Sequence, residues 1–255
     1  MAKVHTGGAG PTLFGDRIER IPTSSVMVGA PVPVPNACDA VYATDGRRRW
    51  VRKPLMGANG LLAEALGLML GRELHAPVPN GAVTGAPNDF EWLSEVLPNI
   101  QHWESQHVNF IINYPDVGRL MALDALLLND DRHAGNLVLQ ATADNEFERR
   151  AWGIDMGNAV VGVPSDFDSA ELATPSIAKL VDKLPVTPIQ EGALLAAVEA
   201  KGLSPYVVTS MVREACELAR EPRENEELLC KALLRRLARA PDLVEEYLSK
   251  IGSRP

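Results

Sequence analysis

The most restrictive feature of the sequence is a polar cluster at the end of its most apolar segment. Residues 116–129 carry Leu, Met, Val or Ala at most positions, which predicts a helix buried on most sides. The cluster that follows, Asn129–Asn136, reads N-D-D-R-H-A-G-N. Burying such groups without partners is costly, so a purely structural chain has little reason to place them there. We therefore expect the cluster to carry chemistry.

A second acidic position follows a predicted β-hairpin. The apolar runs Leu137–Leu139 and Ala151–Ile154 predict its two strands, and the polar residues 144–150 predict the turn between them. Asp155 comes directly after the second strand, and Gly157 lets the backbone bend there. The hairpin is thus expected to bring Asp155 back beside the polar cluster.

The spacing of these polar residues indicates phosphoryl transfer. That reaction needs a carboxylate to position or deprotonate the attacking hydroxyl, and oxygen ligands for one or two magnesium ions. Protein kinases supply an Asp, an Asn five positions later, and a second Asp before a Gly after a hairpin. Asp131, Asn136 and Asp155 repeat this arrangement.

The rest of the chain predicts strands first and helices later. Short apolar runs at 25–28, 40–43, 50–53, 81–84 and 90–96 predict strands, with a hairpin turn at Asp45-Gly46. Residues 60–74 predict a helix that ends before Pro77. After residue 174 the chain is expected to be helical, with a capping box at 187–190 and a helix start at Ser204-Pro205.

Charge and composition exclude several classes of protein. The 255 residues include 25 Lys and Arg against 33 Asp and Glu, which gives a net charge of −8. Broad binding to nucleic acid or to an anionic membrane needs a cationic surplus, so neither is expected as a partner. No apolar run approaches the roughly 20 residues that span a bilayer, and Met1–Gly10 lacks a secretory signal. Cys38, Cys216 and Cys230 are expected to be free thiols in the cytoplasm.

The motifs resemble those of a known kinase family. Asp131–Asn136 looks like the catalytic-loop signature D-R-H-x-x-N of phosphatidylinositol 3- and 4-kinases, and Ile154–Gly157 resembles their metal-binding I-D-F-G. The pattern N-x-D-x-H-x-x-N of the bacterial HipA-like kinases also fits, with Asn129 as its first residue. Val51–Pro54 resembles the strand that carries the nucleotide-binding lysine, and the resemblance extends over about residues 25–160.

This resemblance implies a bilobal, protein-kinase-like α+β fold with a small β-rich N-lobe and a helical C-lobe. We assign residues 1–20 to a flexible tail, 21–98 to the nucleotide-binding N-lobe and 99–255 to the C-lobe with its catalytic loop and helical bundle.

The resemblance also implies roles around the nucleotide. Lys53 would contact the α- and β-phosphates of ATP, and Glu64 would hold that lysine. Asn136 and Asp155 would bind Mg²⁺.

Three neighbouring positions complete the implied machinery. Asp131 would act on the acceptor hydroxyl, and His133 would stabilise charge near the transferred phosphoryl group. Arg132 is expected to be structural.

The chain departs from the family at two places. Met156 stands where the family has Phe or His, and an apolar Met can fill the same pocket. No G-x-G-x-x-G covers the phosphates. The candidate loop is Thr23–Ala30, or the stretch after it to Asn36, in which Ser24 and Ser25 would donate to phosphates or become autophosphorylated.

The expected function is an ATP-dependent kinase that transfers the γ-phosphate to a hydroxyl. A HipA-like Ser/Thr kinase acting on a protein is the first choice, with a separate antitoxin-like regulatory partner. A small-molecule or lipid kinase is the alternative, and the net charge disfavours a lipid. A nucleotide-binding pseudokinase that binds a partner is the alternative of another class.

One charged feature lies outside this assignment. Four cations share a helical face near the C-terminus: Lys231, Arg235, Arg236 and Arg239. Pairing along the helix with the preceding Glu226 and Glu227 is the simpler explanation. A docking face for an acidic partner is the functional one.

Overall fold

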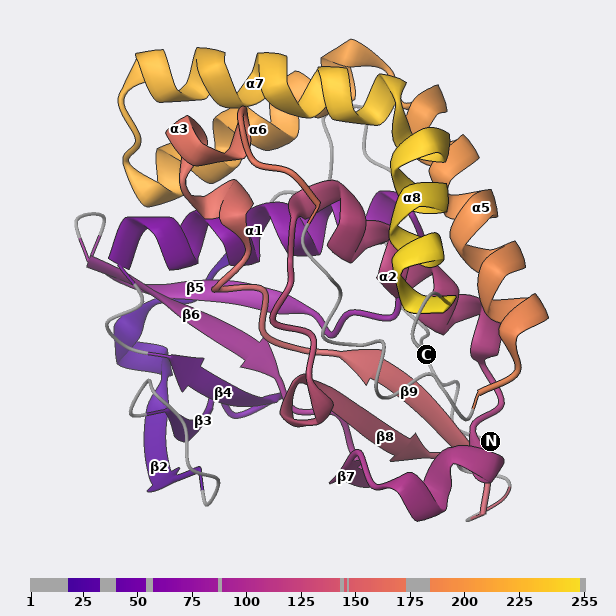
Figure 1. Ribbon diagram of the computed structural model, residues 1–255. Coiled ribbons are helices and arrows are strands. Elements are labelled where there is room, and N and C mark those ends of the chain that lie inside the picture. The colour runs from indigo at the N-terminus through magenta and orange to yellow at the C-terminus, as the bar shows by residue number, and fades with distance from the viewer. Residues whose placement is uncertain are drawn as a thin grey trace, which may run out of the picture.

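The computed structural model describes residues 18–32, 40–53, 57–86, 89–142, 145, 147–172 and 184–252. Strands and helices occupy opposite sides of the molecule (Figure 1). None of the described helices combines the length and the apolar character needed to cross a bilayer.

The N-terminal part forms a six-stranded sheet in the order β1-β5-β6-β4-β3-β2. Its strands are β1 (Glu19–Arg20), β2 (Met27–Pro31), β3 (Val41–Thr44), β4 (Arg49–Lys53), β5 (Gly81–Ala86) and β6 (Asp89–Glu95). All neighbours are antiparallel except β1 and β5. The predicted turn at Asp45-Gly46 is confirmed, because it joins β3 to β4. Pro31 ends the edge strand β2, as expected for a residue without a backbone donor.

Helix α1 (Gly57–Glu73) lies between this sheet and the helical layer (Figure 1). It is buried from Gly60 to Gly71, because it packs against α6 (Pro205–Ala219) as well as against the sheet. Its apolar residues therefore surround the helix instead of forming one stripe. The predicted helix over 60–74 is confirmed.

A second sheet joins the hairpin to the helical layer. Its strands run in the order β7 (Ile100–His102), β8 (Leu137–Ala141) and β9 (Arg149–Gly153). Leu137 pairs with Gly153, and Ile154 N–H donates to the Asn136 carbonyl at 3.0 Å. This register places the end of the polar cluster directly beside the segment that carries Asp155.

The remaining helices form the C-terminal layer. They are α2 (Tyr114–Leu127), α3 (Pro164–Phe167), α5 (Val186–Gly202), α6, α7 (Arg223–Ala238) and α8 (Ala240–Gly252). Short 3-10 helices are η1 (Thr23–Ser25), η2 (Ser105–Phe110), η3 (Ala134–Asn136) and η4 (Val160–Gly162). Helices α2 and α5 cross closely, because a Cβ atom at Gly118 would lie 2.0 Å from the Ile189 carbonyl oxygen.

Two sequence predictions about the C-terminal region have different outcomes. Ser204 caps α6 as expected, since its Oγ accepts from Val207 N–H at 3.2 Å. The capping box at 187–190 is wrong, because α5 begins at Val186 and no side chain caps it. Pro188 is tolerated there because N–H groups of a first helical turn lack partners inside the helix.

Other predictions concern residues at the edges of the described part. Cys216 and Cys230 are free thiols, as expected, and Cys38 lies outside the described residues. The assigned boundary at residues 98 and 99 falls between the two sheets. Residues 1–17 of the assigned N-terminal tail lie outside the described residues, whereas Ile18 is buried and Glu19–Arg20 form β1, so the assignment of 18–20 to the tail is wrong.

Candidate active site

Lys53 lies between two carboxylates at the junction of sheet and helices. It is the last residue of β4 and is only 8% exposed. Its Nζ atom lies 2.6 Å from Glu64 Oε1, on α1, and 3.0 Å from Asp155 Oδ1, after β9. The buried helix α1 brings Glu64 to the lysine, and the hairpin brings Asp155.

This cluster perturbs the ionisation of all three groups. Burial alone would lower the pKa of Lys53, but the charges of Glu64 and Asp155 outweigh it and raise that pKa. Burial raises the pKa of Glu64, and the Lys53 ammonium offsets this only in part. Burial would also raise the pKa of Asp155, but the Lys53 ammonium lowers it below its usual value. Lys53 and Asp155 are therefore both charged near neutral pH.

The polar loop after α2 presents Asp131 at the surface. Leu128 ends the helix with a left-handed backbone, φ +56°. Asn158 Nδ2 donates to Asp131 Oδ2 at 2.8 Å, and His133 Nε2 lies 3.7 Å from Asp131 Oδ1. His133 Nδ1 accepts from Gly135 N–H at 3.0 Å, which leaves Nε2 as the ring nitrogen facing the carboxylate.

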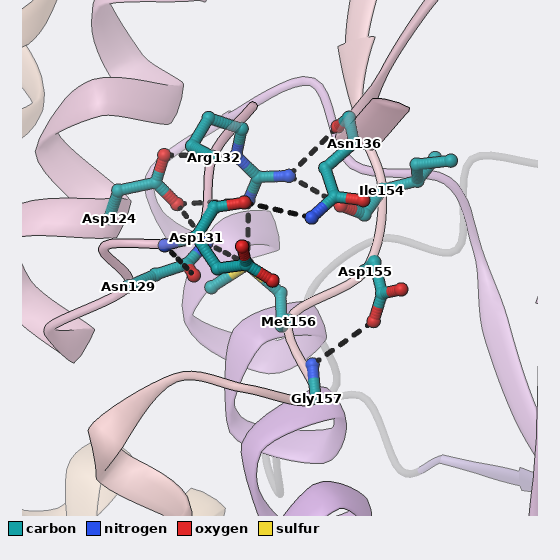
Figure 2. A network of polar contacts seen from close by, with 9 residues as sticks. All are labelled: Asp124, Asn129, Asp131, Arg132, Asn136, Ile154, Asp155, Met156 and Gly157. Atoms are coloured by element: carbon teal, nitrogen blue, oxygen red, sulfur yellow. Dashed lines mark hydrogen bonds and ion pairs between the residues drawn. The ribbon is translucent and has the colours of Figure 1, made fainter. Parts of the chain in front are cut away.

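Asn136 and Asp155 each offer an oxygen beside this loop (Figure 2). Asn136 Nδ2 donates to the Asp131 carbonyl at 2.8 Å, so its Oδ1 is the atom left for a ligand. Asp155 has a left-handed backbone, φ +62°, and its Oδ1 accepts from Gly157 N–H at 3.4 Å. A non-glycine residue adopts this conformation at a cost that functional sites often bear.

A fully buried ion pair anchors the loop to the protein interior (Figure 2). Arg132 and Asp124, on α2, both have side chains with 0% exposure. Arg132 Nε donates to Asp124 Oδ2 at 3.0 Å and Nη2 donates to Oδ1 at 2.9 Å. Arg132 Nη1 donates to the carbonyl of Asn136 at 3.0 Å and to that of Ile154. One guanidinium thus ties together the segments that carry Asn136 and Asp155.

Met156 connects this ion pair to α1. Its Sδ atom accepts from Arg132 Nη2 at 2.9 Å and from Asn129 Nδ2 at 3.5 Å. Gly67 provides the space for the Met156 side chain, because a Cβ atom at position 67 would lie 2.7 Å from Met156 Cγ. The kinases that the motifs resemble have Phe or His at this position, and here a sulfur takes that place and serves a guanidinium as a hydrogen-bond acceptor.

The oxygen atoms present suit magnesium better than a transition metal. The described residues contain no group of three or more His, Cys, Asp and Glu side chains that could enclose an ion. Mg²⁺ is typically bound by one or two carboxylates, with water and substrate phosphates completing the shell. Asn136 Oδ1 and the Asp155 carboxylate fit such a partial set of ligands.

The structure does not bring Ser24 and Ser25 to this site. They lie in η1, before β2, and the sheet register places that end of β2 beside Thr44. Thr44 pairs with Arg49, which lies four residues along β4 from Lys53, or about 13 Å at the usual rise of a strand. Residues 33–36 of the alternative loop lie outside the described residues.

Two residues at the site were not singled out from the sequence. Asp124 lies within the segment that the sequence predicts as a buried apolar helix, and an acid in such a helix itself indicates a cationic partner. Asn158 has no comparable signal, because only the bend after Asp155 turns its amide toward Asp131. Arg132 is buried and structural in its contacts, as the sequence suggested.

Solved structures of kinases share this fold. No protein-family model and no curated protein matches the sequence. The proinflammatory kinase CtkA of Helicobacter pylori superposes with a TM-score of 0.57 at 11% identity, over 90% of this chain and 97% of CtkA. HipA of Shewanella oneidensis MR-1, solved with HipB and operator DNA, gives 0.50 at 12% identity, over 86% of this chain and 67% of HipA. The chain therefore has the bilobal α+β fold of HipA-like kinases, as its motifs predicted.

Proposed function

We propose that this protein is a kinase that transfers the γ-phosphate of ATP to a hydroxyl group. The observation that carries the proposal is the meeting of Lys53, Glu64 and Asp155 beside the loop of Asp131 and Asn136. In phosphoryl transfer the protein contributes mainly by positioning the reactants and by stabilising charge. The kinase fold of CtkA and HipA supports the same reaction class.

On the nucleotide side, Lys53 supplies the fixed positive charge. The raised pKa of Lys53 keeps its ammonium protonated. Glu64 holds that ammonium, which can exchange its contact with Asp155 for one with phosphate oxygens. Mg²⁺ bound by Asn136 and Asp155 would neutralise charge on the β- and γ-phosphates. Arg132 keeps those two ligands at a constant separation through the carbonyls of Asn136 and Ile154.

On the acceptor side, Asp131 orients the hydroxyl and takes its proton. Asn158 holds one carboxylate oxygen, so the other faces the acceptor and the Nε2 atom of His133. That nitrogen is placed to stabilise negative charge on the transferred group.

We propose a Ser/Thr side chain of a protein as the acceptor, with a separate antitoxin-like partner as regulator. The support is the likeness to HipA, whose structure holds HipB, and to CtkA. A small-molecule hydroxyl is the second acceptor. A pseudokinase would keep the nucleotide site and lack turnover.

Transfer from radiolabelled ATP tests the proposal. Wild type, Asp131→Asn and Asp155→Asn are incubated with Mg²⁺ and cell extract, and labelled species are identified by mass spectrometry. We expect Asp131→Asn to lose turnover by at least about 100-fold while keeping nucleotide affinity, because it removes only the proton acceptor. Asp155→Asn should also lose the Mg²⁺-dependent part of that affinity.

Nucleotide binding without any transfer by the wild type would establish the pseudokinase. Equal labelling by all three proteins would contradict the proposed roles of both aspartates. Labelled small molecules in place of labelled protein would move the acceptor to the second class.

A further inference from the structure

A cavity of about 670 Å³ lies away from Lys53, between the end of α3 and helices α7 and α8. Figure 1 shows α3 beside α7, on the side of that helix that faces α1. Residues 167–172 form one wall, and the second half of α7 with the start of α8 forms the others. This volume is in the range of small-molecule sites.

Arginines of the basic face of α7 line this cavity. The two glutamates expected to neutralise that face pair with other residues. Glu226 pairs with Arg213 of α6, and Glu227 pairs with Arg223 one turn earlier. The prediction that these two glutamates pair along the helix with the basic face is therefore wrong. Glu226 lies against α6, where Arg213 is its partner, and Glu227 pairs with Arg223, four residues before it on α7.

Three arginines of that face line the cavity, and they differ in their bonding partners. Arg235 is paired with Asp168. Arg236 lies over the Phe167 ring, 5.2 Å from its centroid, and donates to two carbonyls at the end of α2. Arg239 has no ion-pair partner among the described residues and is exposed. Burial, assisted by the charge of Arg239, lowers the pKa of Arg236 to about 10.

Three carboxylates also line the cavity, and two of them are engaged. Asp168 is held by Arg235, and Glu246 lies 2.9 Å from Lys250. Glu171 has no ion-pair partner within the described ranges. Two guanidinium groups thus face the cavity without a carboxylate bonded to them, against one such carboxylate.

We infer that this cavity binds a small organic anion of the phosphate-monoester class. An arginine fork matches the oxygens of a phosphate in pairs, and Arg239 offers such a fork. Arg236 lies three residues earlier and already donates to two carbonyls, so it adds positive charge beside that fork. The apolar side chains of Phe167 and Leu243 offer contact area to the organic part of the ligand. Neutralising two adjacent cations, one of them half-buried, favours binding.

The walls of the cavity are connected to the active site, so a bound ligand could influence it. Arg236 bonds to the carbonyls of Ala125 at 2.9 Å and Leu126 at 3.0 Å, immediately before the loop that begins at Asn129. The opposite wall belongs to the segment that follows Asp155. Binding itself does not depend on the proposed kinase function.

Isothermal titration calorimetry of the full chain tests the inference. The probes are O-phospho-L-serine, standing for a modified side chain, and glycerol 3-phosphate, standing for a free metabolite, at constant ionic strength. Three single variants locate the site: Arg239→Ala, Glu171→Gln and Arg223→Ala. Arg223 lies on the same helix, is 88% exposed and does not line the cavity, so it controls for net charge.

Saturable binding of at least one probe is expected. Arg239→Ala should weaken it about tenfold, since it removes a direct contact, whereas Arg223→Ala should change it less than about twofold. Glu171→Gln should tighten it, because the opposing charge disappears. Preference for one probe identifies the source of the phosphate. No saturable binding, or equal effects of Arg239→Ala and Arg223→Ala, would overturn the inference.

Discussion

Two clusters of buried charge lie within the same small region and differ in their balance. The cluster around Lys53 has one ammonium and two carboxylates, and Asp155 remains 38% exposed. The pair of Arg132 and Asp124 has one charge of each sign and no exposure at all. The first cluster is thus open and has more carboxyl groups than cations, whereas the second is closed and has one of each.

The difference indicates which cluster can change partners. Asp155 can leave Lys53 without exposing a buried unpaired charge, because Glu64 stays at 2.6 Å. Arg132 has no such freedom, since its nitrogens are bonded to Asp124, two carbonyls and the Met156 sulfur. Chemistry is therefore expected at the open cluster and rigidity from the closed one.

The largest effect is expected from Asp124→Asn. The substitution preserves shape but leaves the Arg132 charge buried without a counter-ion, which typically costs about 3–5 kcal/mol. The free energy of unfolding from urea titration measures it. Glu199→Gln is the matched control, because it breaks another arginine pair of α2, with Arg119, in which the glutamate side chain is 33% exposed. The control should lose about 1 kcal/mol or less.

Equal losses in the two variants would mean that burial does not distinguish these pairs. A fully stable Asp124→Asn protein would show that Arg132 is held by its carbonyl and sulfur contacts alone.

A smaller loss of stability, with a large loss of turnover, is expected from Glu64→Gln. Lys53 keeps Asp155 at 3.0 Å, so we expect a loss of about 1.5–3 kcal/mol, that of one hydrogen bond to a charged group. Turnover should fall because Asp155 must then hold both the lysine and the metal. Urea titration and labelled-ATP transfer measure the two effects.

Glu91→Gln is the control that distinguishes a loss of turnover from a loss of stability. Glu91 pairs with Arg52, the neighbour of Lys53 on β4, but does not contact Glu64 or Asp155 in the described structure. It should alter stability by a similar or smaller amount and leave turnover unchanged. Parallel losses of turnover in both variants would contradict a specific role for Glu64.

The features predicted from the sequence are those with local signals. The turn at Asp45-Gly46, the apolar helix at 60–74 and the hairpin that precedes Asp155 each follow from residues close together in the chain. The resemblance of residues 131–136 and 154–157 to kinase motifs then implies the fold that CtkA and HipA share with this chain. Such signals are independent of how distant elements pack.

The features that were missed depend on packing between distant elements. Asp124 gains its meaning only when the loop folds back and buries Arg132 against α2. The resemblance implies that Ser24 and Ser25 lie near the phosphates, but the pairing of β2, β3 and β4 puts them toward the end of the sheet away from Lys53. The pairing of Glu226 with Arg213 likewise depends on how α6 meets α7.

The smallest effect is expected at Asp45, a carboxylate held mainly by backbone groups. Burial would raise the pKa of Asp45, but the N–H groups of Arg48 and Arg47 outweigh it and lower that pKa from its usual 3.8 to about 2. A lowered folded-state pKa means stability that is present above about pH 4 and is lost as the pH falls toward 2. Asp45→Asn should remove this pH dependence and cost below about 1 kcal/mol at neutral pH. Urea titrations between pH 2 and 5 measure the difference between the two proteins, and parallel curves would show that the turn does not prefer the ionised carboxylate.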